Sequence, residues 1–181
     1  MEVRRVGGVS VTARLYRYVG PAGIAARVLG RPGGTRIDSA ADLVRWVRGT
    51  GQVTDRGGLI AVTFVIDAEG QLLVADRHSE HVACAGGGPV LSAGEMFLSV
   101  AGERVEVVEL SNQSTGYCPE PESWPTVAAA VDRAAVPHPG RFTTEITFRR
   151  CEACSERNVV KDGWFICGVC GVELPGAWNF A

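Results

Sequence analysis

The segment Leu59–Asp76 has the sequence LIAVTFVIDAEGQLLVAD, in which two largely apolar runs flank Ala68-Glu69-Gly70. A short break that contains glycine between two such runs is typical of a β-hairpin. Residues 89–100 and 104–110 repeat this arrangement around Ala101-Gly102-Glu103. The sequence therefore predicts two antiparallel strand pairs in the middle of the chain.

Upstream of these pairs, residues 9–18 (VSVTARLYRY) combine β-branched and aromatic residues with partial alternation, which predicts a first strand. Pro21 suits the first turn of a short helix that runs to Leu29, because the first helical turn needs no backbone N–H from that position. Gly30 then favours the end of this helix.

Two further helices are predicted from their capping residues. Ser39 is an N-cap residue, and Asp42 lies three positions on, near the positive end of the helix dipole. Apolar residues follow at helical spacing until Gly49. A third helix is predicted from a Ser123 cap to about Ala134, with a proline in its first turn.

Alternating residues at 142–149 predict a last strand, which leads into a cysteine-rich tail. Residues 76–88 and 111–121 are rich in polar residues and glycine and are predicted to be connections. Together these elements predict an α+β body at 1–148, with a mostly antiparallel sheet and two or three short helices. A small metal-held ribbon is predicted at 149–181.

The tail contains two C-x-x-C pairs, separated by twelve residues that include the turn sequence Lys161-Asp162-Gly163. Two such pairs, brought together by a hairpin, can deliver four thiolates to one tetrahedral ion. The sequence therefore predicts a structural Zn²⁺ site formed by Cys151, Cys154, Cys167 and Cys170. Four protein ligands leave no position for a catalytic water. Iron in place of zinc, and a redox-active dithiol pair, remain the alternatives.

Composition limits the classes of function. The chain has 46% hydrophobic residues, a net charge of −2 and a single lysine among its 18 basic residues. In the tail, four basic residues face four acidic ones, which argues against nucleic-acid binding. The apolar runs are too short to cross a membrane and the N-terminus lacks an export signal, so we expect a cytoplasmic protein. Abundant Ala, Gly and Arg indicate a GC-rich bacterial gene.

Two central segments hold the candidate site residues. The candidate acid–base and substrate-positioning residues are His81, Glu95 and Tyr117. The candidate ligand-binding residues permit close backbone approach or offer hydrogen bonds: Gly86, Gly87, Gly88, Asn112 and Ser114.

Each of these candidates also has a structural interpretation. His81 could be a hydrogen-bonded structural histidine, the three glycines a tight turn, and Glu95 a surface carboxylate. Cys84 and Cys118 are predicted to be small buried hydrophobic residues.

Four short motifs occur in the order found in a known domain: Tyr18-Val19-Gly20-Pro21, Val62–Val65, His81–Gly88 with Ala93-Gly94-Glu95, and Ser114–Pro119. Residues 14–123 thereby resemble the conserved domain of plant IQ-motif-containing calmodulin-binding proteins, and related segments of bacterial effector-like proteins. The resemblance implies a shared fold and a ligand site at these loops.

The sequence also departs from that family. Gly116 stands where the family has histidine, Val82 and Ala83 replace serines, and Glu95 replaces the arginine of the plant proteins. The chain has no IQ motif, so calmodulin binding is not implied.

Three functions are compatible with the sequence. The favoured one is a zinc-ribbon-containing bacterial binding or adaptor protein, which recognises a small ligand or a protein partner through loops 80–95 and 111–119. The alternative is a group-transfer enzyme of the kind suspected in the effector-like relatives, using His81, Glu95 and Tyr117. Nucleic-acid binding through the ribbon is the weakest of the three, because of the charge balance.

Overall fold

The computed structural model describes residues 13–55 and 57–180. Its elements, in chain order, are α1 (Ala22–Val28), β1 (Thr35–Ile37), α2 (Ala40–Gly49), β2 (Ile60–Asp67), β3 (Leu72–Asp76), α3 (His81–Cys84), β4 (Val90–Ala101), β5 (Arg104–Leu110), the 3-10 turn η1 (Pro121–Ser123), α4 (Trp124–Arg133), β6 (Thr147–Arg150) and β7 (Arg157–Val160). The predicted α+β class and both central hairpins are confirmed.

The main sheet has the strand order β1-β3-β2-β4-β5, and all its pairings are antiparallel. β2 is the central strand, and residues 60–66 of it are all buried. The two hairpins therefore lie side by side, with β2 joining them. This arrangement follows from the nearly continuous apolar run of β2, which needs cover on both faces.

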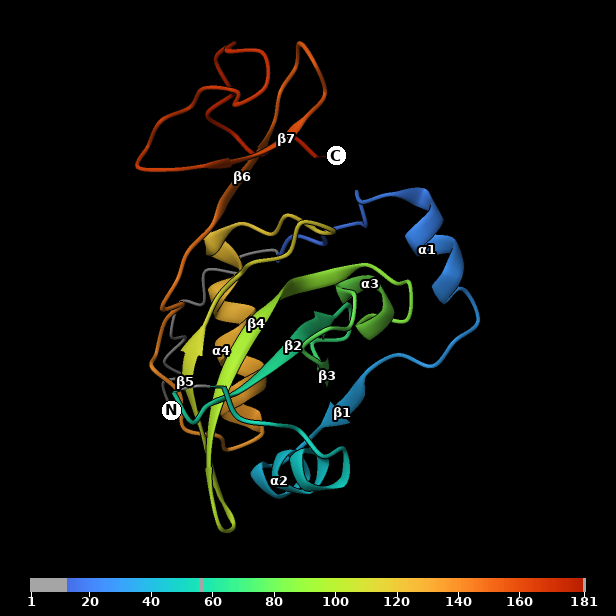
Figure 1. Cartoon of the computed structure of the whole chain (residues 1–181), viewed down its shortest axis with the longest axis vertical. Coiled ribbons are helices and arrows are strands. Elements are labelled where there is room, and N and C mark those ends of the chain that lie inside the picture. The colour runs from blue at the N-terminus through green and yellow to red at the C-terminus, as the bar shows by residue number, and fades with distance from the viewer. Residues whose placement is uncertain (1–12, 56, 181) are drawn as a thin grey trace, which may run out of the picture.

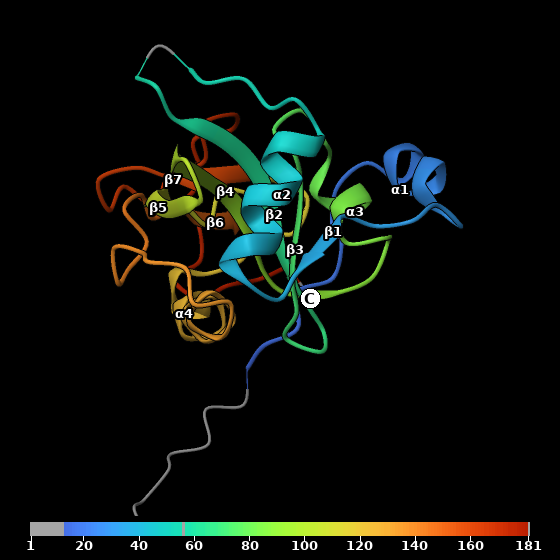
Figure 2. The same cartoon turned by 90° about the horizontal axis from the view of Figure 1, so that it is seen from below.

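Helices cover both faces of the sheet. One apolar cluster joins α2 and α4 to Val62, Phe64 and Ile66 of β2. A second cluster on the other face joins α1 and α3 to Val65. Figure 2 shows α4 and α3 on opposite sides of the strands. The sheet is thus the middle of three layers, and the segments that hold the candidate site residues meet its α3 face.

Ser39 accepts a hydrogen bond from the backbone N–H of Asp42 (3.2 Å), as predicted for an N-cap. Ser123 does not cap α4, because its hydroxyl lies 2.9 Å from that of Ser92 in the core. Helix α4 instead continues directly from η1.

Two predicted strands are shorter than expected. Of residues 9–18, the first four lie outside the described residues, and Tyr16 forms only an isolated bridge with Val90. Of residues 142–149, only the last three belong to β6. The apolar residues of this segment do not share one face of a strand. Phe142 packs in the main core, whereas Phe148 packs in a different apolar cluster.

The sequence did not predict β1 or α3. β1 has three residues, and the glycine pair before it crosses α3, where a Cβ on Gly34 would lie 2.7 Å from the Cys84 sulfur. The 80–84 turn is helical for four residues only. Both elements depend on contacts distant in sequence, which the local sequence pattern does not reveal.

No helix in the described ranges is long and apolar enough to span a membrane.

The cysteine-rich tail projects from one end of the body (Figure 1). β6 and β7 pair in it as a separate two-stranded sheet. The chain then returns to the body, where Phe180 packs with Cys118 and Phe148. The boundary predicted at 148/149 stays a prediction, since β6 spans it and the last residues contact the body.

Candidate functional site

The four tail cysteines lie on two turns of the same construction. In the first, Cys151 N–H donates to Glu156 O (2.8 Å) and Ser155 N–H donates to Cys151 O (2.8 Å). In the second, Cys167 N–H donates to Val172 O (2.8 Å) and Gly171 N–H donates to Cys167 O (3.0 Å). The fifth residue of each turn has a positive φ, 62° at Ser155 and 74° at Gly171. Two matching turns thus present two cysteines each.

The predicted turn between the pairs is confirmed. Asp162 and Gly163 both have positive φ (51° and 70°), and Lys161 pairs with Trp164 across them. Two positive φ values at the centre of such a turn are the type I′ pattern, which matches the twist of a hairpin. This hairpin folds the second cysteine pair back onto the first.

The four sulfurs of Cys151, Cys154, Cys167 and Cys170 lie within 4.8 Å of one another. Cys151 Sγ is 3.5 Å from Cys170 Sγ, and Cys154 Sγ is 3.6 Å from Cys167 Sγ. All four are free cysteines. The predicted ligand set is therefore confirmed as a group positioned to hold a metal ion.

Backbone and amide groups surround Cys167. The N–H of Val169 (3.4 Å) and the side-chain amide of Asn158 (3.5 Å) both donate to its sulfur. The side-chain oxygen of Asn158 in turn accepts a hydrogen bond from Gly168 N–H (2.9 Å). Hydrogen bonds from the backbone N–H groups of Cys170 and Val169 lower the pKa of the Cys167 thiol to about 6. Such donors stabilise the thiolate, which is the form that binds metal.

Arg149 attaches the tail to the body. The residue is 5% exposed, and its guanidinium donates to Glu120 Oε1 (2.6 Å) and to Gly176 O (2.8 Å). Trp178 adds a bond from Nε1 to Cys118 O (2.7 Å). A buried ion pair of this kind fixes geometry more than it adds stability. The tail is thus clamped at the 118–120 loop.

Three of the four motifs that carry the resemblance contribute residues to one cluster, and the fourth, Val62–Val65, pairs with β4 at Gly94. We define the central cluster as Tyr18, His81, Gly88, Gly94, Gly116 and Tyr117. The Tyr18 ring lies against Gly116, where a Cβ would approach to 2.7 Å, and makes an edge contact with Tyr117 at 5.7 Å between centroids. Tyr117 donates its hydroxyl proton to Gly88 O (2.6 Å), and His81 bonds Gly94 O (3.0 Å).

His81 begins α3 and is half-buried. Its Nε2–H donates to the Gly94 carbonyl, which fixes the tautomer. Burial lowers the pKa of His81, and this outweighs the hydrogen bond to Gly94 and the charges of Glu95 and Glu80, which raise it. At neutral pH the imidazole is therefore neutral, with a structural bond at Nε2.

Tyr117 and Glu95 differ in setting. Tyr117 is fully buried, and burial raises the pKa of its phenol well above the usual value. Glu95 lies half-buried on β4, opposite Thr63 of β2. Among the described residues, no hydrogen bond joins His81, Glu95 and Tyr117 to one another. Their catalytic role stays a prediction that these contacts do not favour.

The glycine-rich segment ends α3. Gly86 N–H donates to Ala83 O (3.0 Å), Gly87 N–H to Val82 O (2.8 Å), and Gly88 N–H to Ala85 O (3.2 Å). Gly86 and Gly87 have positive φ. This is the Schellman pattern of a helix C-terminus. The three amides are already bonded, so the geometry favours the tight turn over a phosphate cradle.

Asn112 closes the 111–121 loop. Its side chain is fully buried, donates to Pro119 O (2.8 Å) and Ile146 O (2.7 Å), and accepts from Ile146 N–H (2.7 Å). Ser114 is also buried, and its hydroxyl has no partner in the described part of the chain. Asn112 thus connects the loop to the residues before β6, and a ligand-binding role for these two residues stays a prediction.

The remaining two cysteines behave as predicted. Cys84 and Cys118 are buried, and burial raises the pKa of each thiol to about 12. Both are therefore protonated, unreactive thiols at neutral pH.

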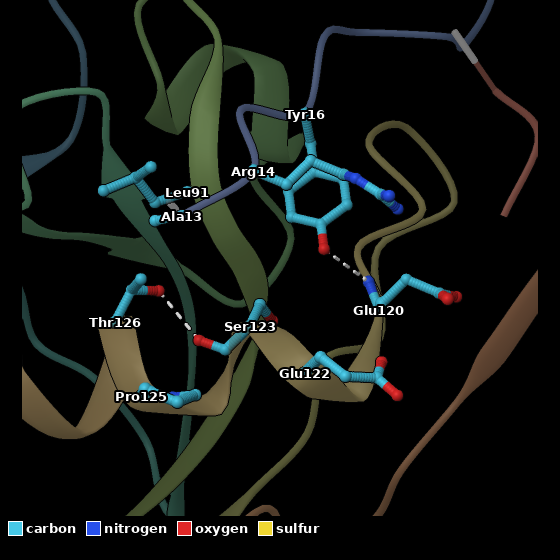
Figure 3. Close-up of a pocket in the computed structure, with 9 residues that line it drawn as sticks. All are labelled: Ala13, Arg14, Tyr16, Leu91, Glu120, Glu122, Ser123, Pro125 and Thr126. Atoms are coloured by element: carbon cyan, nitrogen blue, oxygen red, sulfur yellow. Dashed lines mark hydrogen bonds between the residues drawn. The ribbon is translucent and has the colours of Figure 1, made fainter. Parts of the chain in front are cut away.

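A pocket of about 310 Å³ lies beside the start of α4 (Figure 3). It is lined by Ala13, Arg14, Tyr16, Leu91, Glu120, Glu122, Ser123, Pro125 and Thr126. Several of its polar groups bond within the protein: Glu120 N–H donates to the Tyr16 hydroxyl (3.2 Å), and Thr126 donates to Ser123 O (2.8 Å). None of the predicted site residues lines it, and no motif in the sequence indicated it.

Comparison with known proteins gives no relative. No family model matches the chain, and neither a curated protein nor a solved structure matches it. What the protein does must therefore be argued from its own residues.

Proposed function

We propose that this is a binding or adaptor protein whose C-terminal ribbon, folded around one structural zinc ion, docks a protein partner. The observation that carries the proposal is the distribution of exposed apolar side chains. Of nine large ones in the described residues, five lie between 159 and 172: Val159, Trp164, Ile166, Val169 and Val172.

The sulfur geometry supports zinc. A tetrahedral centre with Zn–S bonds of about 2.3 Å has S···S edges of about 3.8 Å. The two closest sulfur pairs lie 3.5 and 3.6 Å apart. Four thiolates at such spacing favour zinc over harder ions, and a filled set of four ligands suits a structural ion. Because thiolate ligands persist in a reducing compartment, we also propose a cytoplasmic location.

The exposed apolar residues support docking. Soluble proteins rarely leave a large contiguous apolar patch uncovered unless it binds something. The ribbon's own core is small, with Cys151, Cys167 and Leu174 buried together. Trp164 is 72% exposed and Val169 69%. Residues that the ribbon does not need for its own folding are thus available to a partner.

We prefer the ribbon over loops 80–95 and 111–119 as the recognition surface. In those loops the Gly86–Gly88 amides, the Tyr117 hydroxyl and the Asn112 amide all have partners within the chain. A ligand there would have to replace these bonds, which costs free energy. The exposed apolar side chains of the ribbon can contact a partner without breaking hydrogen bonds within the chain.

The zinc part is tested by native mass spectrometry of the full chain. One zinc per chain is expected, and cobalt substitution should give the absorption of a tetrahedral thiolate site. An apo protein, or one with its four tail sulfurs oxidised to each other, contradicts the proposal.

The docking part is tested with a photo-cross-linking residue at Val169 in the source organism. The matched position is Leu29, which is 75% exposed at the C-cap of α1. A partner identified from Val169 alone, which rebinds as purified protein and is lost with Cys167→Ser, supports docking. Equal cross-linking from both positions contradicts it.

A further inference from the structure

Three of the four basic residues of the ribbon make contacts close to its junction with the body. Arg149 is buried in its pair with Glu120. Arg157 donates to Thr115 O, and Arg150 lies with its guanidinium 5.4 Å from the centre of the Phe180 ring. These three cations hold the tail in place. Arg149 is buried and Arg150 and Arg157 are half-buried, so these cations are less exposed than the carboxylates of the ribbon.

The acidic residues of the ribbon are exposed. Glu152, Glu156, Asp162 and Glu173 are all exposed, and Lys161 is the one exposed cation among described residues 149–180. None of the four carboxylates takes part in an ion pair within the described ranges. Four thiolates around one divalent ion, as proposed above, would add a net charge of about −2. The ribbon surface is therefore acidic although the tail sequence is balanced.

Apolar anchors stand within this acidic surface. Trp164 follows the type I′ turn, and Phe165 points inward against the cysteine cluster. In an extended segment, alternate residues share a face, so Ile166 lies on the side of Trp164. An exposed indole is the side chain that binding interfaces most often use as an anchor, and it also attracts cations through its ring face.

Resting on the proposed docking role, we infer that the partner segment is a peptide stretch in which apolar residues alternate with lysine or arginine. The apolar residues pack on Trp164 and Ile166. The cations face the surrounding carboxylates, including Asp162 and Glu173. A nucleic acid would meet like charge here, and a second copy of this ribbon would also bring carboxylates against carboxylates.

The test uses the zinc-loaded full chain and three labelled synthetic peptides of equal length, measured by fluorescence anisotropy. The first alternates lysine and leucine, the second glutamate and leucine, and the third lysine and serine. We expect the lysine–leucine peptide to bind tightest, with an affinity that falls as NaCl is raised from low to physiological concentration.

Variants locate the binding surface. Trp164→Ala is expected to weaken the lysine–leucine peptide about tenfold or more, as for a central anchor. Leu29→Ala, at an equally exposed apolar residue of the body, should leave binding unchanged. The double variant Asp162→Asn with Glu173→Gln should weaken binding and flatten its salt dependence.

The inference is overturned if the glutamate–leucine peptide binds equally well, if no peptide binds, or if Trp164→Ala has no effect. It is also overturned if sedimentation shows a dimer that Trp164→Ala dissociates, because the occupant is then a second copy. Zinc content and ribbon hydrogen exchange are measured on the same samples. If these are as proposed and the peptides fail, only the partner chemistry is wrong; if the metal is absent, the docking role itself fails.

Discussion

The central cluster and the ribbon are built in opposite ways. In the central cluster, glycines permit close packing, and polar side chains form hydrogen bonds with the backbone, as Tyr117 does with Gly88 O. In the ribbon, one group of four cysteines holds the chain, while Trp164 and Val169 stay exposed. The body is thus stabilised by packing and the ribbon by ligation. Perturbations should separate the two regions.

Metal removal should give the largest effect. Structural zinc contributes on the order of 10 kcal/mol to such a module, so a strong chelator or Cys167→Ser should abolish hydrogen-exchange protection across the β6–β7 hairpin. The five-stranded sheet should keep its protection, because its core contains none of the four cysteines. Cys84→Ala, at a buried cysteine of the body, should retain one metal ion. Loss of sheet protection on chelation would show that the two regions fold as one.

Gly94→Ala tests packing in the body. A Cβ at Gly94 would lie 1.8 Å from the backbone oxygen of Ser111. Because a backbone atom cannot rotate away as a side chain can, β4 would have to separate from the segment that follows β5. We expect a loss of about 3 kcal/mol or more in the free energy of unfolding, measured in urea.

The matched control is Gly23→Ala on α1, where a Cβ meets nothing within 4 Å. That change should be neutral or stabilise by up to about 1 kcal/mol, through helix propensity. A small effect of Gly94→Ala would mean that the close approach at Ser111 relaxes easily.

Asn112→Ala should have the next largest effect. It removes a buried side chain that makes three hydrogen bonds, and leaves the Pro119 and Ile146 carbonyls to find other donors. A loss of about 2–3 kcal/mol is expected by thermal or urea unfolding. Gln113→Ala, one residue on and exposed, should change stability by less than about 0.5 kcal/mol. Equal effects of the two changes would mean that the hydrogen bonds of Asn112 do not stabilise the connection between the 111–121 loop and the residues before β6.

Features that are encoded by neighbouring residues could be predicted from the sequence, whereas features that depend on distant contacts could not. The hairpins, the Ser39 cap, the turn at 161–163 and the cysteine pairs are each encoded within a few neighbouring residues, and all were predicted. β1 was not, because a three-residue strand is defined by its distant partner β3. The same limit applies to the site. That Arg149 would pair with Glu120 could not be predicted from the tail sequence, and this pairing leaves one cation fewer to balance the exposed carboxylates of the tail.

The central cluster shows the same limit. Its motifs identified residues that meet in space, but residue type alone did not distinguish a ligand site from a set of structural bonds. His81 fits both descriptions until its partner is known. The partner is a backbone carbonyl at 3.0 Å, so the bond fixes the imidazole in place.

The smallest expected effect concerns that imidazole. Burial lowers the pKa of His81 in the folded chain below the value of about 6.5 that it has when unfolded. As pH falls below about 6.5, the unfolded chain therefore binds a proton that the folded chain does not. The stability contributed by neutral His81 is thus present above this pH and is lost on acidification.

His81→Gln should reduce the loss of unfolding free energy between pH 7.5 and 5.5 by at most about 1.4 kcal/mol. His78→Gln, in an exposed loop, controls for the removal of one histidine. Both variants are compared with the parent chain at each pH with zinc in excess, so that any protonation of the cysteine ligands is common to all three. A loss of stability on acidification that is the same with and without His81 would mean that its ring is not held neutral. The bond to Gly94 would then restrain a charged side chain, and the central cluster would be open to solvent at His81.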